Sequence, residues 1–510
     1  MNILKFKLLN EYKIFKDGFE INFKKDNILV VTGENGSGKS ILLEMILKAF
    51  ISIQNVCDNE KQKSKCDFNF EIIYSFSIQN NLISFFTAEQ IKEIEGKDIL
   101  VYITYVENKI TFEIKAESNI LLINDNLMDL RLFLPTKIIA YSSGQNETLS
   151  RPIYEYNINR FKEYYDNMRA ELITHINEKK FIFLDEKYKF LNLISNLLFN
   201  SNNMKNIYEL IGVRNINSFQ INLEFYDYKN REIKLPEEKL FLIDKLKYYG
   251  NKIIEINNLI SYHFETNLEN SNKIKEDFKN DAKTFYELLE FLEDMNLYKV
   301  RSNMINPKYH SNVQDYKKIY NAYDKGKKVF EIENVKVTVN NGSVIDVNDI
   351  SDGEFQVLQI IGCISIYEDD NILFLFDEPE THFNIRWKAK FIEDLLQVIN
   401  NTAQMIFSTH SLEILTDIKK KKITLIKNGC VEQINIETFG TNTTLIGAEL
   451  FKNNKSVSNI AYKRYKEYMD RITRANIEEL NEIEENIKKE FGDSAERILL
   501  FYEINKNRSR

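Results

Sequence analysis

Residues 28–50 read ILVVTGENGSGKSILLEMILKAF, and this stretch decides the fold of the chain. The apolar run 28–31 predicts a buried strand, and the apolar spacing in 41–50 predicts a helix. Between them, residues 33–40 match GxxxxGK[ST], the pattern of a phosphate loop. A glycine turn lets backbone N–H groups approach phosphate, and the helix N-terminus adds a positive dipole end. The sequence therefore predicts a site for ATP.

The side chains of this loop have expected roles. Lys39 would reach the β- and γ-phosphates, and Ser40 would bind Mg²⁺ through its hydroxyl. A glycine loop that only caps a helix is the alternative, and the flanking strand and helix weigh against it. The other positions expected to contact the nucleotide are Asn35, Gly36, Ser37 and Gly38.

Composition limits the class of protein. The 510 residues carry 68 Lys and Arg against 76 Asp and Glu, a net charge of −8, so contact with nucleic acid should be local at most. The four cysteines form no CxxC pair, and no run of about 18 apolar residues is present. We therefore expect a cytoplasmic protein that does not enter a membrane.

Two segments place Asp-Glu directly after an apolar run, namely FIFLDE at 181–186 and ILFLFDE at 372–378. A phosphate loop needs a carboxylate at a neighbouring strand end for Mg²⁺ and a base for the attacking water. The second segment continues as PETH, and a later strand ends at His410. Asp377 is therefore predicted to bind Mg²⁺ and Glu378 to act as the general base, whereas 185–186 is interpreted as a solvated helix start.

The order of predicted elements indicates an α/β fold. Alternating runs over 68–115 predict an antiparallel sheet, and the segment after 351 alternates helices and strands, which predicts a mostly parallel sheet. Helical periodicities such as 273–295 dominate the middle of the chain, interrupted by a predicted strand pair at 219–226 and 232–235, before a hairpin at 335–347. We expect an ATPase head in two parts, 1–150 and 335–450, separated by a mainly helical insert, 151–334, and followed by a helical tail, 451–510.

Residues 349–354 read DISDGE, and Ser351 with Glu354 three residues later predicts a helix cap. The order of phosphate loop, Ser-x-Gly-Glu, Asp-Glu and Thr-His also resembles the ABC-type ATPase head of SMC and RecF-like proteins. The resemblance implies a homodimer in which Ser351, Gly353 and Glu354 of one subunit contact the ATP of the other. Asp352 departs from the small residue often found there.

The same resemblance implies two further catalytic residues. His410 would act as the switch histidine that senses the γ-phosphate. Gln145, in YSSGQNE at 141–147, would join the Mg²⁺ shell, although a plain polar turn remains the alternative.

The segments IIAYSSGQNETLSRP, 138–152, and FIFLDEKYKFLNLI, 181–194, resemble stand-alone AAA-type ATPases of bacterial anti-phage and restriction-associated systems, such as the Septu ATPase. This implies an ATP-driven switch that controls a separately encoded nuclease or toxic effector, with assembly beyond a dimer left open. We find no nuclease motif in the chain.

Two other functions remain open. A RecF-like DNA-repair clamp would bind DNA directly, and the basic clusters 419–422 and Lys325, Lys327 and Lys328 are its candidate contacts. A transporter subunit is disfavoured, because the large insert has no obvious counterpart in a transport head.

Overall fold

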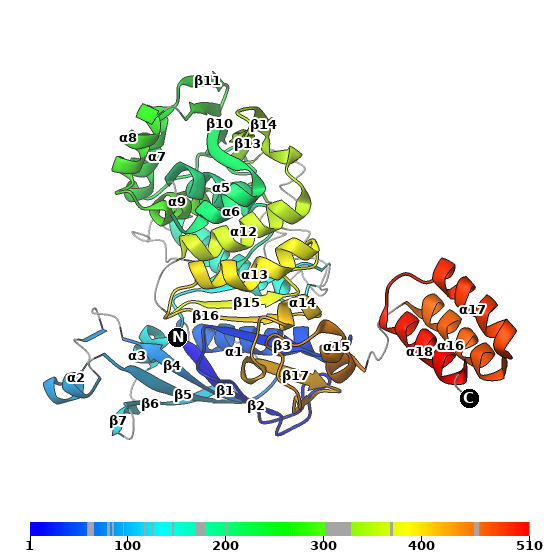
Figure 1. The fold of residues 1–510 in the computed structure, drawn as a ribbon. Coiled ribbons are helices and arrows are strands. Elements are labelled where there is room, and N and C mark those ends of the chain that lie inside the picture. Colours follow the sequence, from blue (N-terminus) through cyan, green and yellow to red (C-terminus); the bar gives the residue numbers. More distant parts are fainter. Residues whose placement is uncertain are drawn as a thin grey trace. The chain divides into compact units, whose positions relative to one another are not determined.

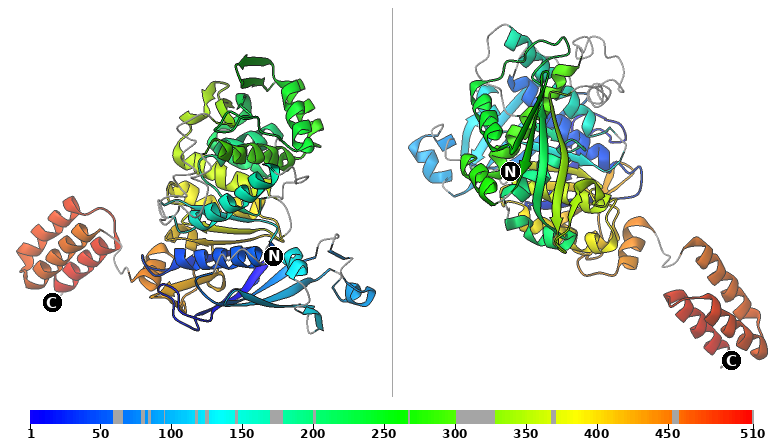
Figure 2. Two further views of the ribbon diagram at one scale, coloured as in Figure 1. Left: turned by 180° about the vertical axis from the view of Figure 1, so that it is seen from behind. Right: turned by 90° about the horizontal axis from the view of Figure 1, so that it is seen from above.

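The computed structural model describes residues 1–58, 66–78, 82–83, 86–94, 96–116, 119–123, 127–144, 147–169, 179–199, 202–266, 268–300, 328–367, 371–452 and 458–508 (Figures 1 and 2). The chain forms two compact units. The first contains Met1–Ile414 and Lys421–Glu432, and the second contains Leu415–Lys420 and Gln433–Arg510.

A seven-stranded sheet forms the centre of the first unit, with strand order β18-β17-β3-β16-β15-β8-β9. All neighbouring strands are parallel except β18, which pairs antiparallel with β17. The strands are β3 (Ile28–Thr32), β8 (Ile138–Ser142), β9 (Phe181–Phe183), β15 (Leu373–Asp377), β16 (Gln404–Ser408), β17 (Ile423–Lys427) and β18 (Cys430–Glu432). The predicted strands 372–376 and 404–408 are confirmed, as is the α/β class.

Helix α1 (Lys39–Asp58) lies between this sheet and an antiparallel sheet of order β2-β1-β4-β5-β6-β7 (Figure 1). One hydrophobic cluster joins side chains of α1 to both sheets. In the described part of the chain α1 is long and apolar enough to cross a membrane, but 72% of that apolar window is buried inside the protein, as in a core helix. The strands of the second sheet are β1 (Asn2–Leu8), β2 (Glu20–Asn22), β4 (Phe70–Ser77), β5 (Asp98–Val106), β6 (Lys109–Ala116) and β7 (Asn119–Ile123), with the short helices α2 (Ala88–Ile94) and α3 (Leu127–Leu130) between them.

The insert contains helices, as predicted, but it also contains much of a five-stranded antiparallel sheet. The predicted strand pair 219–226 and 232–235 corresponds only to the end of one strand of that sheet, Val213–Leu223, and to an isolated bridge between Tyr226 and Glu232. The strand order of the sheet is β11-β12-β10-β13-β14, and Figure 2 shows its long strands from above. The predicted hairpin is present as β13 and β14, and β13 pairs with β10, so the hairpin completes the sheet of the insert. The strands are β10 (Val213–Leu223), β11 (Lys252–Ile256), β12 (Leu259–Glu265), β13 (Phe330–Val339) and β14 (Val344–Asp346). The helices are α4 (Ser150–Arg169), α5 (Tyr188–Phe199), α6 (Lys205–Ile211), α7 (Glu237–Tyr249), α8 (Leu268–Asp277) and α9 (Ala282–Asp294).

Helices α12 (Asp352–Ile366), α13 (Ile385–Val398) and α14 (Leu412–Leu415) follow the insert and connect the strands of the parallel sheet. The second unit contains α15 (Thr443–Phe451), α16 (Asn459–Arg474), α17 (Ile477–Glu490) and α18 (Ala495–Arg508). The last three share a hydrophobic core, which includes Tyr468, Ile483 and Leu500. The predicted helical tail is therefore a small helical bundle.

Candidate functional site

The register of the parallel sheet aligns four strand ends in one row. Asp377 of β15 is the partner of Ser408 of β16 on one side and of Ser142 of β8 on the other. Ser408 in turn is the partner of Val31, at the end of β3. The carboxyl ends of parallel strands form the usual ligand edge of an α/β sheet, and the phosphate loop leaves β3 at this edge.

Lys39 lies at the start of α1 with its ammonium group turned into the phosphate loop. Its Nζ donates to the carbonyl oxygens of Gly33 and Glu34, both at 3.2 Å, and lies 2.5 Å from His410 Nε2. Burial lowers the pKa of Lys39, whereas the nearby carboxylates of Glu378 and Asp377 oppose that shift. The lysine predicted to bind phosphate thus lies beside the predicted metal ligand Asp377 and the predicted base Glu378.

The other loop residues differ in exposure. Asn35 and Gly36 are exposed, Ser40 is half-buried, and Gly38 is buried. The Ser37 hydroxyl is also buried and has no hydrogen-bond partner in the described structure. The Ser37 N–H donates to the Glu34 carbonyl oxygen at 3.1 Å, a bond within the loop itself.

The turn before β2 packs against the phosphate loop, a contact that the sequence analysis missed. A Cβ atom on Gly38 would lie 2.6 Å from Ile14 Cδ1 and 2.8 Å from Phe15 Cζ. Gly38 also has a φ of +113°, which a side chain would disfavour. Both constraints require glycine at this position, even before phosphate contacts are considered.

Asp377 and Glu378 are held differently by the same neighbour. The Asp377 side chain is buried and accepts from Ser408 Oγ at 2.5 Å. The Glu378 N–H donates to Ser408 Oγ at 3.0 Å, and the Glu378 backbone is left-handed, with a φ of +49°. Burial and the charge of Asp377 raise the pKa of Glu378. A carboxylate with a raised pKa is a better proton acceptor, as a general base requires.

His410 lies between the predicted base and the phosphate-loop lysine. Its Nε2 is 3.3 Å from Glu378 Oε1 and 2.5 Å from Lys39 Nζ. Burial and the charge of Lys39 lower the pKa of His410 to about 4. The imidazole is therefore neutral near pH 7, so Nε2 can accept a hydrogen bond from the Lys39 ammonium group.

Glu380 is a buried carboxyl next to this site that the sequence analysis did not assign. Its side chain is 4% exposed, its Oε1 accepts from the Thr409 hydroxyl, and its Oε2 has no partner in the described structure. Burial raises the pKa of Glu380 to about 7. Glu380 stands two residues after Glu378 in the sequence, but only the structure shows that its side chain is buried.

Ser351 caps α12, as predicted. Its N–H and Oγ donate to Glu354 Oε2 at 3.2 and 2.6 Å, and a capping box is formed. Ser351 is exposed, whereas Gly353 is half-buried and lies against the loop after Glu378. Gln145 lies outside the described residues.

The second Asp-Glu pair, Asp185 and Glu186, follows β9 at the edge of the same sheet. Asp185 accepts from the Tyr154 hydroxyl at 2.7 Å and from the Lys187 N–H at 3.3 Å, and Glu186 is exposed. These bonds orient the start of α5, in agreement with the helix-start interpretation, although β9 is itself a strand of the parallel sheet.

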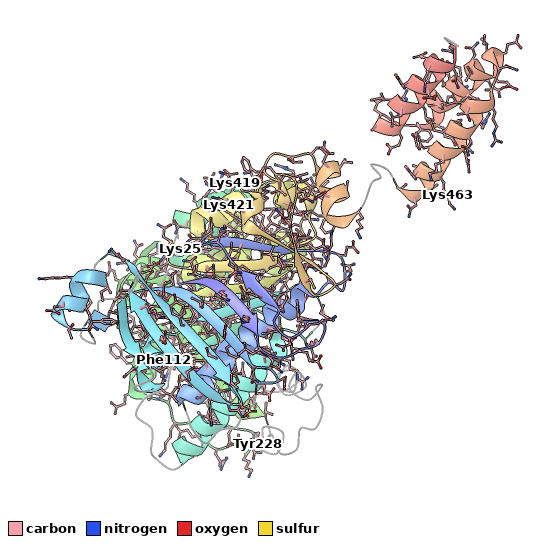
Figure 3. The ribbon with its side chains drawn as sticks, turned by 90° about the horizontal axis from the view of Figure 1, so that it is seen from below. Lys25, Phe112, Tyr228, Lys419, Lys421 and Lys463 are labelled. Atoms are coloured by element: carbon pink, nitrogen blue, oxygen red, sulfur yellow. The ribbon has the colours of Figure 1, made fainter. Side chains whose placement is uncertain are left out.

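Basic residues gather at the opposite edge of the sheet, where β3 and β17 begin. Figure 3 labels Lys25 and Lys421 on the same side of the first unit, and an ion pair of 2.8 Å between Lys422 and Asp26 joins the two segments. Lys25 itself pairs with Asp98 at 2.8 Å, so part of this charge is neutralised. Of the second predicted cluster, Lys325 and Lys327 lie outside the described residues.

The donor set at the site fits Mg²⁺ only together with a nucleotide. In the described ranges, no three His, Cys, Asp or Glu side chains converge as a metal site. The protein would contribute the Asp377 carboxylate and the Ser40 hydroxyl. Mg²⁺ is usually bound by one or two carboxylates plus substrate phosphates, so this small donor set is sufficient.

Residues 222–416 match the protein family described as "AAA domain, putative AbiEii toxin, Type IV TA system". This stretch is similar to that family. The matched residues include Ser351, Asp377, Glu378 and His410, whereas the phosphate loop precedes the match in the sequence. The predicted relation to AAA-type ATPases is confirmed.

The chain is also similar to a "Retron Vc95 probable ATPase" from Vibrio cholerae serotype O1 biovar El Tor. The two are 23% identical over 439 residues, which cover 82% of this chain and 72% of the relative.

Solved SMC heads are similar at low TM-scores. The head of Smc bound to the C-terminal winged-helix domain of ScpA has a TM-score of 0.34 and 11% identity, and covers 85% of this chain and 96% of its own. The SMC head domain from Thermotoga maritima has a TM-score of 0.33 and 11% identity, with coverage of 86% and 100%. The fold assignment itself rests on the strand order and on the position of the phosphate loop.

Proposed function

We propose that this chain is a Mg²⁺-dependent ATPase that acts as a switch, closing as a homodimer around ATP. One observation carries the proposal. Lys39 and Asp377 are separated by 377 − 39 = 338 positions, yet the sheet register places Lys39 beside Asp377, Glu378 and His410. Such a convergence of phosphate-binding, metal-binding and proton-accepting groups is the requirement for phosphoryl transfer to water.

The chain's own residues divide the chemistry. Lys39 would exchange its bonds to Gly33 and Glu34 for phosphate oxygens, which are stronger, charge-assisted acceptors. Glu378 would accept the proton of the attacking water, and His410 would contact the γ-phosphate from beside it. Mg²⁺, when bound through Ser40, Asp377 and the nucleotide, neutralises phosphate charge. Gln145 remains a candidate for that shell.

The dimer would complete the site. Ser351 is exposed at the N-terminus of α12, where the helix dipole favours an anion, so it is accessible to the nucleotide of a second copy. Gly353 and Glu354 stand in the same turn. We propose that these three residues contact the ATP bound to the partner.

The biological setting is proposed from the comparisons. The matched family is described as a putative toxin of a toxin–antitoxin system, and the relative is named a retron ATPase. Together with the resemblance to anti-phage ATPases, this supports a bacterial defence switch that controls a separately encoded nuclease or toxic effector in the cytoplasm.

The decisive experiment compares Glu378→Gln with Glu186→Gln, the matched residue of the second Asp-Glu pair. Glu378→Gln should lower the rate of phosphate release about 100-fold or more, because the base is lost, while ATP still produces dimers in light scattering. Glu186→Gln should hydrolyse ATP like the wild type. Monomers in the presence of ATP, or undiminished hydrolysis by Glu378→Gln, would refute the proposal.

A RecF-like clamp that binds DNA directly is the second candidate, favoured by the lysines around Lys25 and Lys421. If this candidate is right, the purified protein alone binds duplex DNA, and replacing Lys25 and Lys421 by Ala weakens binding and reduces its salt dependence. Unchanged DNA binding by this variant would reject the lysine surface as the contact.

A further inference from the structure

The loop that follows the predicted base has a backbone that needs support. Glu378 is left-handed and precedes Pro379, a combination that costs free energy for a residue with a side chain. The Glu378 N–H donates to Ser408, and the Thr381 hydroxyl donates back to the Glu378 carbonyl at 2.9 Å. Because the conformation is unfavourable, the position of the Glu378 carboxylate depends on such contacts.

Helix α12 contacts this loop at two points. Gln356 Nε2 donates to the Pro379 carbonyl at 2.7 Å, and the Gln356 side chain is only 5% exposed. One turn earlier, a Cβ atom on Gly353 would lie 2.7 Å from the His382 carbonyl oxygen, so glycine is needed for this close approach. The first two turns of α12 therefore lie directly against residues 379–382.

The Gln356 bond is costly to break. The Gln356 side chain also lies close to the Tyr141 hydroxyl on β8, so its amide group is enclosed on the strand side as well, and its Oε1 is buried without a hydrogen-bond partner in the described structure. A buried carbonyl or amide left without a partner costs about 1–3 kcal/mol. A displacement of α12 will therefore tend to carry the Pro379 carbonyl with it rather than leave the bond unmade.

We propose that Gln356 is a positioning residue that couples the N-terminal turn of α12 to the loop carrying Glu378. This inference rests on the proposed function, in which that turn contacts the partner's ATP. Closure of the dimer would act on Ser351 and Gly353, and the Gln356 bond would transmit the shift to the peptide that follows the base. ATP hydrolysis would then be fast only when the N-terminal turn of α12 contacts the ATP of the partner.

Helix α12 supplies a matched control. Gln359 Nε2 donates to the Asp185 carbonyl, also at 2.7 Å, but this bond leads to β9 and α5 instead of the catalytic loop. Replacing either glutamine by Met keeps a similar volume and removes the donor. Gln356→Met and Gln359→Met therefore remove bonds of the same kind from the same helix.

Phosphate release should separate the two variants. We expect Gln356→Met to lower kcat about tenfold or more, because a small displacement of a reacting group is costly, with KM for ATP and ATP-dependent dimerisation within about twofold of wild type. Gln359→Met should keep the wild-type kcat at a similar loss of melting temperature. Equal effects of the two variants on kcat, or a change confined to KM, would overturn the inference.

Two further results keep the outcome clear. If Glu378→Gln hydrolyses ATP at the wild-type rate, the proposed function is wrong. If Glu378→Gln is inactive but Gln356→Met hydrolyses ATP at the wild-type rate, only the proposed role of Gln356 is wrong. Hydrogen exchange of the wild-type protein needs no variant. A non-hydrolysable ATP analogue should protect peptides covering 351–358 and 379–384 together, and protection of the first without the second would contradict the coupling.

Discussion

The two Asp-Glu pairs follow strands of the same parallel sheet, and both strands flank β8. Ala140 of β8 is the partner of Leu375 in β15 and of Phe183 in β9, so both pairs lie at the same level of the sheet. Their surroundings nevertheless differ. Asp377 and Glu378 lie beside the phosphate-loop lysine, whereas Asp185 is bonded to Tyr154 and Glu186 is exposed.

Strand order explains the difference. β15 is two strands from β3, and β9 is four strands away at the sheet edge. At a strand spacing of about 4.8 Å, these separations are roughly 10 and 19 Å. A shared metal ion or nucleotide can bridge the first distance but not the second, so an identical local motif is predicted to be functional in one place and structural in the other.

The largest expected difference concerns the two aspartates. Asp377→Asn should lower ATP hydrolysis at saturating ATP about 100-fold or more, because it removes the carboxylate predicted to bind the Mg²⁺ that neutralises the reacting phosphates. Asp185→Asn should stay within about twofold of wild type in the same phosphate-release assay. Similar losses in both variants would mean that the second pair also serves catalysis.

The lysine beside each pair gives the next test. Lys39→Ala should weaken ATP binding by about 2–3 kcal/mol, roughly 30- to 160-fold, because charged hydrogen bonds to phosphate are lost. Lys187, which lies 3.4 Å from Asp185, serves as the control. Equilibrium binding of a fluorescent ATP analogue measures both variants, and weaker binding by Lys187→Ala would break the comparison.

A pH-dependent effect on stability is expected for Glu380, whose pKa is raised to about 7 by burial. The folded protein holds this proton more tightly than the unfolded chain, so wild-type stability falls as the pH rises from about 4.5 to 7. Glu380→Gln removes this loss, and should be more stable than wild type by up to about 3 kcal/mol at pH 8 but nearly equal at pH 4.5. Urea denaturation at both pH values tests this, with Glu186→Gln expected to differ little from wild type at either.

The smallest effect should come from Tyr154→Phe. This change removes the hydroxyl that donates to Asp185 at 2.7 Å and should lower the free energy of unfolding by about 1 kcal/mol. Hydrolysis should be unaffected. A lower kcat for ATP hydrolysis in Tyr154→Phe, measured at a temperature where the variant is fully folded, would show that the second Asp-Glu pair affects catalysis.

The sequence predicted the elements that carry strong local signals. The strands around the phosphate loop and the Asn-Gly hairpin are confirmed. The predicted helix 273–295 is instead divided into α8 and α9, because Lys279 and Asn280 are left-handed and Asp281 caps a new helix. The hairpin of β11 and β12 was missed, because β11 is mostly exposed and shows no clear alternation, and pairing with β10 orders it.

By itself, the sequence determined which chemical groups are available and in what order, from the phosphate loop to the Thr-His strand end. Only the tertiary structure decided which Asp-Glu pair stands beside Lys39, because that depends on strand order across the sheet. It also buried Glu380 and placed Gln356 against Pro379. A local sequence pattern shows which residue types are present. The pKa values and hydrogen-bond partners of these residues depend on burial and on distances between remote segments, which are set only when the sheet is assembled.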